Sequence, residues 1–503
     1  MLDNFKIDIY GIMAFRKYCS FKILFKANKK ERYVNMKNFD VIIVGAGIAG
    51  ICTAYELSKN NNLKICIFEQ GKNIYDRRCP TLRTNKQCIN CKECSIMKGF
   101  GGAGNFSDGK YNFTTEFGGW LSEYISEEEV MELINYVDSI NVKFGATQER
   151  FSTKNAIEFK KKALGYDLHL LQADVKHLGT ENNLQILKNM YEYLLSKDNV
   201  TIICNTKVES FNVSDTNNYS IYLECGEKLK CKYLVVAPGR SGAEWFSNQC
   251  KNLKIPLLNN QVDIGVRVEV PAIVYKDITD NIYEAKLKYQ TKKYGDIVRT
   301  FCMNPNGYVV AENVDGLITV NGHSYSDPKM KSENTNFAIL VSNKFTEPFD
   351  DPYTYGKSIA SLSNLLGKGV IVQRFGDLMH GRRSNDTRMA KGFVKPTLFA
   401  VPGDLSLVLP ARQLKDIIEM IEVLDKVAPG TANEDTLLYG VEVKFYSAKP
   451  KLTSNLEVQK NDNEVYNNFY ALGDGAGVTR GLAQAGASGI HVARSIILKE
   501  KKN

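Results

Sequence analysis

Three glycines and a carboxylate carry the clearest chemistry in this sequence. Gly45, Gly47 and Gly50 have the spacing G-x-G-x-x-G after an apolar run, and Glu69 ends a second apolar run. The first glycine permits a tight turn, the second lets a pyrophosphate approach bare backbone, and the third lets a helix pack on a strand. Backbone N–H groups at the helix start then face the phosphates. A carboxylate in the position of Glu69 can accept hydrogen bonds from both ribose hydroxyls. We therefore expect a βαβ unit that binds FAD or NAD rather than NADP.

Four cysteines form a second group that could do chemistry. Cys88, Cys91 and Cys94 have the spacing C-x2-C-x2-C, and Cys79 precedes them. This spacing lets consecutive thiolates converge on three corners of an iron-sulfur cubane, with Cys79 as the fourth metal ligand. Zinc more often takes two separated C-x2-C pairs. The sequence favours a [4Fe-4S] cluster and leaves zinc and unligated, redox-active thiols open as alternatives.

A glycine-rich stretch, GFGGAGNFSDGK, follows the cysteines at residues 99–110. It lacks a strand and a helix of its own, so we do not interpret it as a second dinucleotide fingerprint. We expect backbone wrapped closely over a planar ligand, with Ser107 and Asp108 as polar contacts. A flexible surface loop is the alternative.

Length and composition limit the class of protein. The 503 residues allow two or three domains, and 44% apolar residues is ordinary for a globular chain. No uninterrupted apolar run is long enough for a membrane span. The net charge of +9 is modest and mixed along the chain, so a nucleic-acid partner is not required. Four of the 12 cysteines lie close together at residues 79–94 and no signal peptide is visible, which favours a cytoplasmic protein.

Several motifs in a fixed order resemble a known family. They are Arg-x-Cys-Pro (77–80), the glycine-rich stretch, His-x-Gly-Thr (177–180), VVAPGRSG (235–242), RTFCMNPNGYV (299–309) and ALGDGAG (471–477). From Met36 onward the chain resembles bacterial FAD-dependent dehydrogenases of unassigned substrate, which are NAD(P)/FAD-dependent oxidoreductases with a glutathione-reductase-type fold. The resemblance implies an α/β protein with a Rossmann-like FAD-binding domain and an inserted, mainly β-sheet substrate domain.

The resemblance also implies how further residues contact FAD. Val208 would present backbone to the adenine, and Asp474 would bind ribityl or pyrophosphate oxygens. The start of the last helix would point N–H groups at the flavin and stabilise its reduced, anionic form. Together with the glycine pattern, the expected cofactor contacts are Gly45, Ala46, Gly47, Ile48, Ala49, Gly50, Glu69, Gln70, Gly102, Ala103, Gly104, Asn105, Ser107, Asp108, Val208, Pro238, Gly239, Gly473, Asp474, Gly475, Ala476, Gly481, Leu482 and Gln484.

The pattern of elements divides the chain. Residues 1–35 lack a clean amphipathic period and are interpreted as a dispensable extension, with Met36 as the working start. The FAD-binding domain is expected at 36–120, 190–245 and 465–503, a helical insertion at 121–189 and a substrate domain at 246–464. Periodicity predicts helices at 126–140, 183–197, 357–367 and 411–426, and strands at 200–212, 219–224, 231–237, 262–270, 296–303, 307–314 and 316–325.

The function expected is that of an FAD-dependent oxidoreductase, which exchanges a hydride between flavin N5 and an unidentified organic substrate. Candidates for positioning substrate or moving a proton are Lys110, Arg299, Cys302, His323, Tyr325 and His380, although each could be an ordinary packed residue. A ferredoxin-like donor could pass electrons through the cysteine centre, and NAD(P)H is the other possible donor. An RNA-modifying flavoprotein and a non-redox, flavin-dependent isomerase are the alternative functions.

Overall fold

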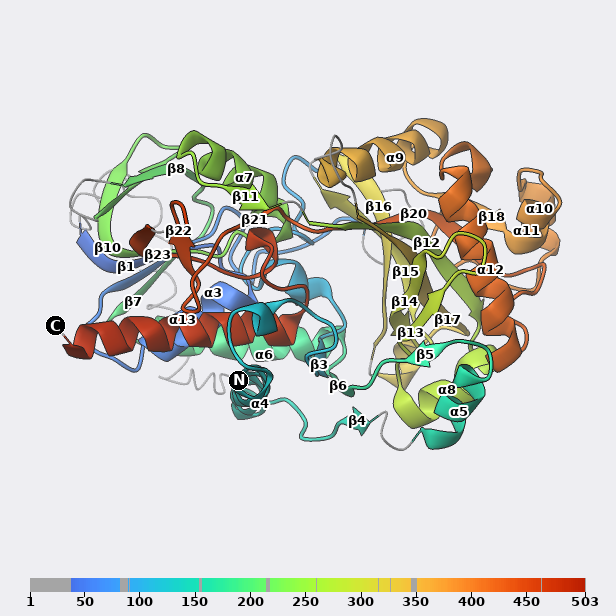
Figure 1. Ribbon diagram of the computed structural model, residues 1–503, viewed down its shortest axis with the longest axis horizontal. Coiled ribbons are helices and arrows are strands. Elements are labelled where there is room, and N and C mark those ends of the chain that lie inside the picture. The colour runs from blue at the N-terminus through green and yellow to red at the C-terminus, as the bar shows by residue number, and fades with distance from the viewer. Residues whose placement is uncertain are drawn as a thin grey trace, which may run out of the picture.

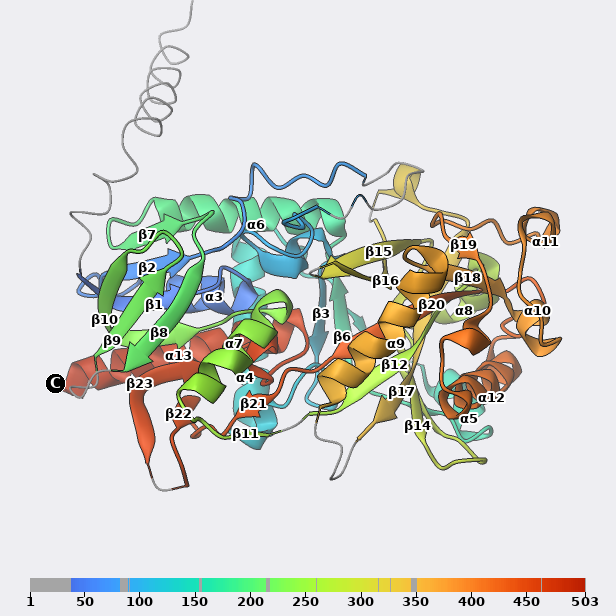
Figure 2. The same ribbon diagram turned by 90° about the horizontal axis from the view of Figure 1, so that it is seen from above.

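The computed structural model describes residues 38–81, 89, 91–152, 156–213, 218–258, 260–314, 316–325, 327–344, 351–462 and 464–502. The predicted N-terminal extension and Cys88 lie outside these residues. The described chain forms two lobes side by side, each built on an eight-stranded sheet (Figures 1 and 2). No described helix is long and apolar enough to cross a membrane.

The sheet of the first lobe has the topology that the βαβ unit predicts. Its strand order is β22 (Glu457–Gln459), β23 (Val465–Ala471), β10 (Lys228–Val236), β1 (Asn38–Val44), β2 (Ile65–Phe68) and β7 (Val200–Ile203). β8 (Val208–Val213) and β9 (Tyr219–Leu223) extend it beside β10. From β23 to β7 all neighbouring strands are parallel. This arrangement confirms the α/β, Rossmann-like class, because parallel strands need helical crossovers on the sheet faces.

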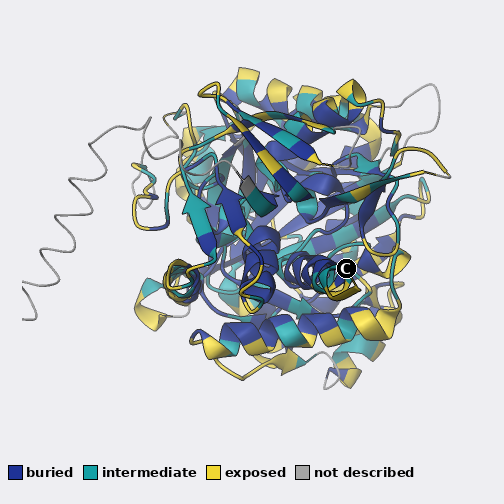
Figure 3. Ribbon diagram, turned by 90° about the vertical axis from the view of Figure 1, so that its left-hand side faces the viewer, coloured by how far each residue is buried: buried dark blue, intermediate teal, exposed yellow. Residues whose placement is uncertain are grey.

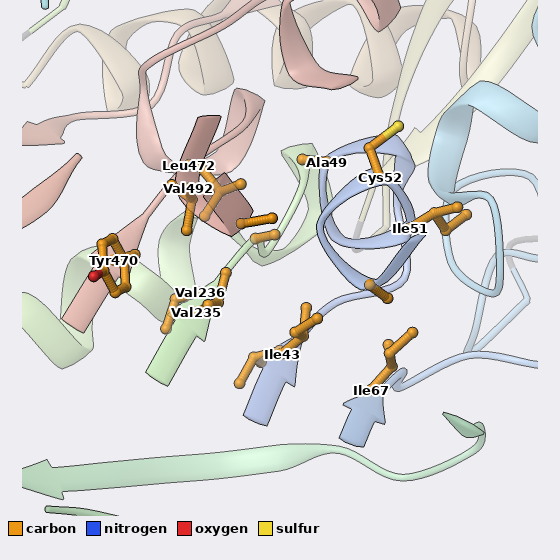
Figure 4. Close-up of a cluster of buried hydrophobic side chains, with 14 of the residues drawn as sticks. Ile43, Ala49, Ile51, Cys52, Ile67, Val235, Val236, Tyr470, Leu472 and Val492 are labelled. Carbon is orange, nitrogen blue, oxygen red and sulfur yellow. The ribbon is translucent and has the colours of Figure 1, made fainter. Parts of the chain in front are cut away.

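Two central helices pack closely because of small residues. α3 (Ile48–Leu57) follows the first glycine turn, and α13 (Leu482–Lys502) is the last element of the chain. A Cβ added at Gly489 would lie 2.3 Å from the carbonyl oxygen of Ala49, so only glycine fits between α13 and α3 there. The buried cluster of Figure 4 joins both helices to the sheet through side chains such as Ile43, Val235 and Val492. Figure 3 shows this dark-blue core enclosed by helices with exposed outer faces.

The part of the chain between β2 and β7 contains helices, as the sequence predicts. α4 (Glu127–Lys143) begins at Ser126, whose side chain accepts a hydrogen bond from the Glu129 N–H, and α6 (Thr180–Leu195) is amphipathic. α5 (Ile157–Leu164) lies between them. The same region also holds strands β4 (Phe151–Ser152), β5 (His169–Leu170) and β6 (Asp174–His177), and β6 pairs with β3 (Lys110–Phe113).

The second lobe is built on a mainly antiparallel sheet. Its order is β19 (Val401–Pro402), β18 (Ile371–Arg374), β20 (Leu437–Phe445), β12 (Val262–Pro271), β17 (Asn334–Asn343), β14 (Ile297–Asn304), β13 (Leu287–Gln290) and β5. The hairpin of β15 (Tyr308–Val314) and β16 (Leu317–His323) forms a separate two-stranded sheet. The helices are α8 (Ala272–Ile282), α9 (Pro352–Gly367), α10 (Phe375–Met379), α11 (Asp386–Lys391) and α12 (Ala411–Val427). The predicted strands and helices of this region are confirmed, whereas β17, β20 and α8 were not predicted.

The two faces of the second sheet differ in chemistry. On β12, Ile264 and Val266 belong to the apolar core that includes α12, while Asp263 and Arg267 alternate with them and point to the opposite face. That polar face meets the first lobe: Trp120 packs edge-on against Tyr446, which hydrogen-bonds to Asp263. The junction between the lobes is therefore lined with charged and polar side chains.

Candidate cofactor-binding site

A cavity of about 490 Å³ lies at the carboxyl ends of β1, β2 and β10. In open parallel sheets, ligands bind outside the carboxyl ends of the strands, so this is the expected position for a cofactor. Of the expected contacts, the cavity is lined by Gly45, Gly47, Glu69, Gln70, Gly102, Ala103, Val208, Pro238 and Gly239. Residues far apart in the sequence are thus brought together around one space.

The three fingerprint glycines occupy different surroundings. Gly45 has φ +106°, and an added Cβ would lie 2.2 Å from the Ala237 carbonyl oxygen. A Cβ at Gly50 would lie 2.1 Å from the Gly45 carbonyl oxygen. Any side chain at this position would therefore prevent α3 from packing against the turn. At Gly47 an added Cβ meets nothing within 4 Å. The first and third glycines therefore shape the turn, and the second leaves backbone open beside the cavity.

Glu69 is buried and bonded to three backbone amides. One carboxylate oxygen accepts from the Ala46 N–H at 3.0 Å. The other accepts from the N–H groups of Gly71 at 2.8 Å and Gly99 at 2.9 Å. A carboxylate has about four lone-pair sites, so about one remains for a ribose hydroxyl. The sequence predicts that Glu69 binds both ribose hydroxyls. It does not predict that the same carboxylate also holds the glycine-rich loop through the Gly99 N–H.

The glycine-rich loop packs directly on the first turn. The N–H of Gly101 donates to the Ala46 carbonyl at 2.8 Å, and a Cβ at Gly102 would lie 3.2 Å from the Gly47 Cα. Within the loop, Asn105 is 2% exposed, and its side-chain oxygen and nitrogen both lack a hydrogen-bond partner. An unpaired buried amide is costly, so the loop fits a bound ligand that supplies hydrogen bonds.

The C-terminal turn at residues 473–476 packs against Gly239, which lines the cavity. A Cβ at Gly475 would lie 2.0 Å from the Gly239 carbonyl oxygen, so the two expected contact segments touch. Asp474 accepts a hydrogen bond from the Thr479 hydroxyl at 2.7 Å. Gln484 accepts from the Leu121 N–H at 3.4 Å and donates to the Phe117 carbonyl at 3.3 Å. Its side chain holds the 117–121 loop over the start of α13, a role that the sequence did not indicate.

Lys110 reaches from the glycine-rich loop into the second lobe. Its ammonium lies 3.3 Å from Asp108 and 3.4 Å from Glu284, and it bonds the Met303 carbonyl and the Asn304 side chain. Burial alone would lower the pKa of Lys110, but Asp108 and Glu284 raise it above its ordinary value. Lys110 is therefore a fixed cation that joins the two lobes.

A buried histidine next to this lysine was not among the predicted site residues. His177 Nε2 lies 3.1 Å from the Ser324 hydroxyl and 3.7 Å from Asp108, and its ring stacks on Tyr283 at 4.5 Å. The Tyr283 hydroxyl also lies 2.9 Å from the Ser324 hydroxyl. Burial lowers the pKa of His177 to about 4 despite Asp108, so the ring is neutral at pH 7. Its place in the His-x-Gly-Thr motif was the available signal.

The other candidates lie in three different surroundings. Arg299 pairs with Asp263 at 3.1 Å on the polar face of the second sheet. Cys302 is in the left-handed region, with φ 41°, and its carbonyl accepts from buried Arg267 at 2.6 Å. His380 caps α10 on the surface and contacts the Gly376 carbonyl, away from the lobe junction.

His323 and Tyr325 face a second cavity, of about 390 Å³, together with Cys79, Cys91 and Cys94. The three described cysteines are partly buried and free of disulfides. Among the residues that the structure describes, no three His, Cys, Asp or Glu side chains are grouped so that they could hold a metal ion. Since Cys88 lies outside those residues, the four-cysteine metal centre stays a prediction.

Arg77, from the Arg-x-Cys-Pro motif, fixes the cysteine segment. Its guanidinium donates to the carbonyls of Ser95 and Ile96, each at 2.9 Å, and of Phe100 at 2.7 Å. Burial lowers its pKa to about 10, with Glu69 opposing the shift. The sequence motif did not reveal this role, because the three carbonyls lie about 20 residues downstream.

Family models match two parts of this chain. Residues 261–445 match the family model described as FAD-dependent protein, C-terminal domain-like, and residues 23–74 match the Thi4 family. An uncharacterized protein of Clostridium beijerinckii is 28% identical over 479 residues, which cover 91% of this chain and 80% of that protein. Chloroplastic thiamine thiazole synthase 4 of Physcomitrium patens is 64% identical over only 32 residues, 6% of this chain and 9% of that enzyme.

Among solved structures, L-proline dehydrogenase from P. horikoshii aligns over 92% of this chain and 94% of its own, at 12% identity and a TM-score of 0.41. A likeness this distant identifies no function. The match of residues 261–445 to the FAD-dependent family model is the firmer finding, and these residues lie in the second lobe. This chain therefore joins a Rossmann-like lobe to a lobe that matches the model of the C-terminal domain of FAD-dependent proteins.

Proposed function

We propose that this protein is an FAD-dependent oxidoreductase whose organic substrate binds at the junction of the two lobes. The observation that carries the proposal is the cavity at the carboxyl ends of β1, β2 and β10, with Gly47 open beside it and Glu69 at its edge. The match of the second lobe to FAD-dependent proteins supports FAD over NAD.

The residues present fit this cofactor. Gly47 offers backbone with no neighbouring atom in the way, Glu69 retains a lone pair for one ribose hydroxyl, and Asn105 has an unsatisfied amide. When bound, FAD supplies a hydride acceptor and donor at N5. The protein supplies binding, orientation and a controlled charge environment.

At the lobe junction, the chain places fixed positive charges beside a neutral histidine. Lys110 stays protonated because Asp108 and Glu284 outweigh its burial, so it contributes a fixed positive charge to the junction. His177 stays neutral at pH 7 because burial lowers its pKa to about 4, and its Nε2 contacts the Ser324 hydroxyl, so the ring takes part in a hydrogen bond without carrying charge. Arg299 is a second fixed cation on the same face of the second lobe.

The source of electrons is a separate part of the proposal. We expect the flavin to be reduced by one of two routes. Either a ferredoxin-like protein passes electrons through a cysteine-bound cluster, or NAD(P)H reduces the flavin directly. No described set of side chains holds a metal, so no step is assigned to a cluster.

The experiment compares Gly47→Val with Gly165→Val after anaerobic purification. An added side chain at Gly47 meets open space, so the variant should keep its melting temperature while blocking the dinucleotide. Gly165 ends α5 with φ −62°, so its variant is the control for the substitution itself. We expect FAD, identified after heat release, in the wild type and the control but not in Gly47→Val. Equal FAD content in Gly47→Val, or no flavin in the wild type after loading, would overturn the proposal.

A further inference from the structure

The second cavity, of about 390 Å³, lies between the cysteine segment and the hairpin of β15 and β16. None of its lining residues lines the dinucleotide cavity. Its volume is in the range that holds a small organic ligand. It is a separate space with walls from both lobes.

A short segment separates the two cavities. Ser95 and Ile96 line the second cavity, whereas the next residues, Met97 and Lys98, line the dinucleotide cavity. Arg77 holds this wall through the carbonyls of Ser95 and Ile96. The wall is therefore anchored by a buried cation rather than left as an unsupported loop.

The lining of the second cavity favours a flat, apolar ligand. Tyr308 and Tyr325 lie in edge-on contact, with ring centroids 6.0 Å apart, and both line the cavity. Phe399 and Ile89 also line it and are 61% and 62% exposed, so they give the mouth of the cavity an apolar rim. Aromatic walls and an exposed apolar rim suit a planar ring system.

The charged side chains among the described lining residues of this cavity have one sign. Arg78 and Lys368 line it, His323 adds an imidazole, and no described lining residue is Asp or Glu. Arg78 and Lys368 are both exposed and can reach a ligand at the mouth. A carboxylate is therefore favoured there and an ammonium group is disfavoured.

We infer that the second cavity is a binding site for a planar aromatic carboxylate. The ring lies between the tyrosines and Phe399, and the carboxylate meets Arg78 and Lys368. Cys79, Cys91 and Cys94 line the same space, so an occupied site shields their thiols. This site does not depend on FAD, because its lining is distinct from that of the dinucleotide cavity.

The first test is calorimetric titration of the full chain with three probes of equal size: 1-naphthoate, neutral 1-naphthamide and cationic 1-naphthylmethylamine. We expect 1-naphthoate to bind most tightly and the amine not to bind. The variant Arg78→Gln/Lys368→Gln should bind 1-naphthoate about tenfold more weakly, since each lost contact is a charge-assisted hydrogen bond. Lys415→Gln/Lys426→Gln removes two exposed charges from α12 and should leave binding unchanged.

The second test maps alkylation of individual cysteines by iodoacetamide in the wild type after treatment with a chelator, with elemental analysis to verify that no iron or zinc remains on the thiols. Saturating 1-naphthoate should slow alkylation of Cys79, Cys91 and Cys94 and leave exposed Cys225 unaffected. Absence of 1-naphthoate binding, equal binding of all three probes, or unchanged alkylation of the three cysteines would each overturn the inference. The FAD content measured in the same samples reports on the proposed function, so failure of one proposal is distinguishable from failure of the other.

Discussion

The carboxylate of Glu69 accepts a hydrogen bond at 2.9 Å from the backbone N–H of Gly99, which lies 30 residues further along the chain. It also accepts from Gly71 and, with its other oxygen, from Ala46. The end of β2, the first glycine turn and the start of the glycine-rich loop are thus held by one side chain. A residue predicted as a cofactor contact is also a structural support for the site.

The variant Glu69→Ala should lose both cofactor and stability. Three buried N–H groups would be left without an acceptor, and each such group costs about 1–3 kcal/mol. We expect a free energy of unfolding at least about 3 kcal/mol lower than in the wild type, even without FAD, together with weaker FAD binding. Denaturant unfolding of the cofactor-free proteins measures this. Glu422→Ala, at an exposed position of α12, is the control. Unchanged stability of Glu69→Ala would contradict the role described here.

The local features of the first lobe could be predicted because they depend on residues close in sequence. The turn at Gly45, the packing at Gly50 and the cap at Ser126 each need only local geometry, and all three occur in the structure. The second task of Glu69 could not be predicted in this way. It depends on Gly71 and Gly99 approaching so closely that a Cβ at Gly71 would lie 2.4 Å from the Gly99 nitrogen.

Replacing Arg77 with lysine should loosen the wall between the two cavities. Lysine keeps the positive charge but cannot donate to three separate carbonyls in the geometry of a guanidinium. We expect Arg77→Lys to increase the alkylation rate of Cys91 and Cys94 several-fold and to lower the melting temperature. Cysteine-resolved mass spectrometry measures the rates. Arg383→Lys changes an exposed arginine that lines neither cavity and should have no effect on either quantity. Equal rates in wild type and Arg77→Lys would show that the wall has another anchor.

The lobe junction was the least predictable part of the candidate site. Lys110 was a candidate, but its partner Glu284 lies in a segment for which the sequence predicted neither strand nor helix. His177 was passed over as a site residue because it stands in a motif without a chemical signature of its own. Its neutral, buried state follows from contacts with Tyr283 and Ser324, which tertiary packing alone brings together. His323 and Tyr325 were named as site candidates and face the second cavity.

His177 should make stability depend on acidic pH. Burial lowers the pKa of His177 to about 4 in the folded state, whereas the pKa of an exposed histidine is about 6.5. Between these values the unfolded chain binds a proton that the folded chain does not. The free energy of unfolding therefore falls as pH decreases from about 6.5 to about 4, by at most about 3 kcal/mol from this residue. His177→Gln should flatten this part of the curve, measured by urea unfolding at each pH. His169→Gln, at an exposed position, should not. Parallel curves for wild type and His177→Gln would refute the assignment.

A chain that begins at Met36 should fold and bind FAD like the full chain. β1 begins at Asn38, so this shortened protein keeps the whole βαβ unit. We expect the two proteins to have the same FAD content per chain and melting temperatures within about 2 °C, since the removed sequence has no periodic apolar face that would favour packing on a core. Insolubility or loss of flavin in the shortened protein would show that the first 35 residues pack on the folded lobes.

The last prediction concerns the metal centre expected from Cys79, Cys88, Cys91 and Cys94. A cubane would give about four irons per chain after anaerobic purification and broad absorption at about 400 nm that bleaches with dithionite. Zinc would give one metal per chain without visible absorption, and free thiols would all react with a thiol reagent. Because bound flavin also absorbs visible light, elemental analysis decides between these outcomes. Cys91→Ser should abolish the metal, whereas Cys225→Ser, at an exposed position outside the segment, should retain it. Protein without iron or zinc, and with all four thiols reactive, would remove the metal centre and leave NAD(P)H as the expected electron donor.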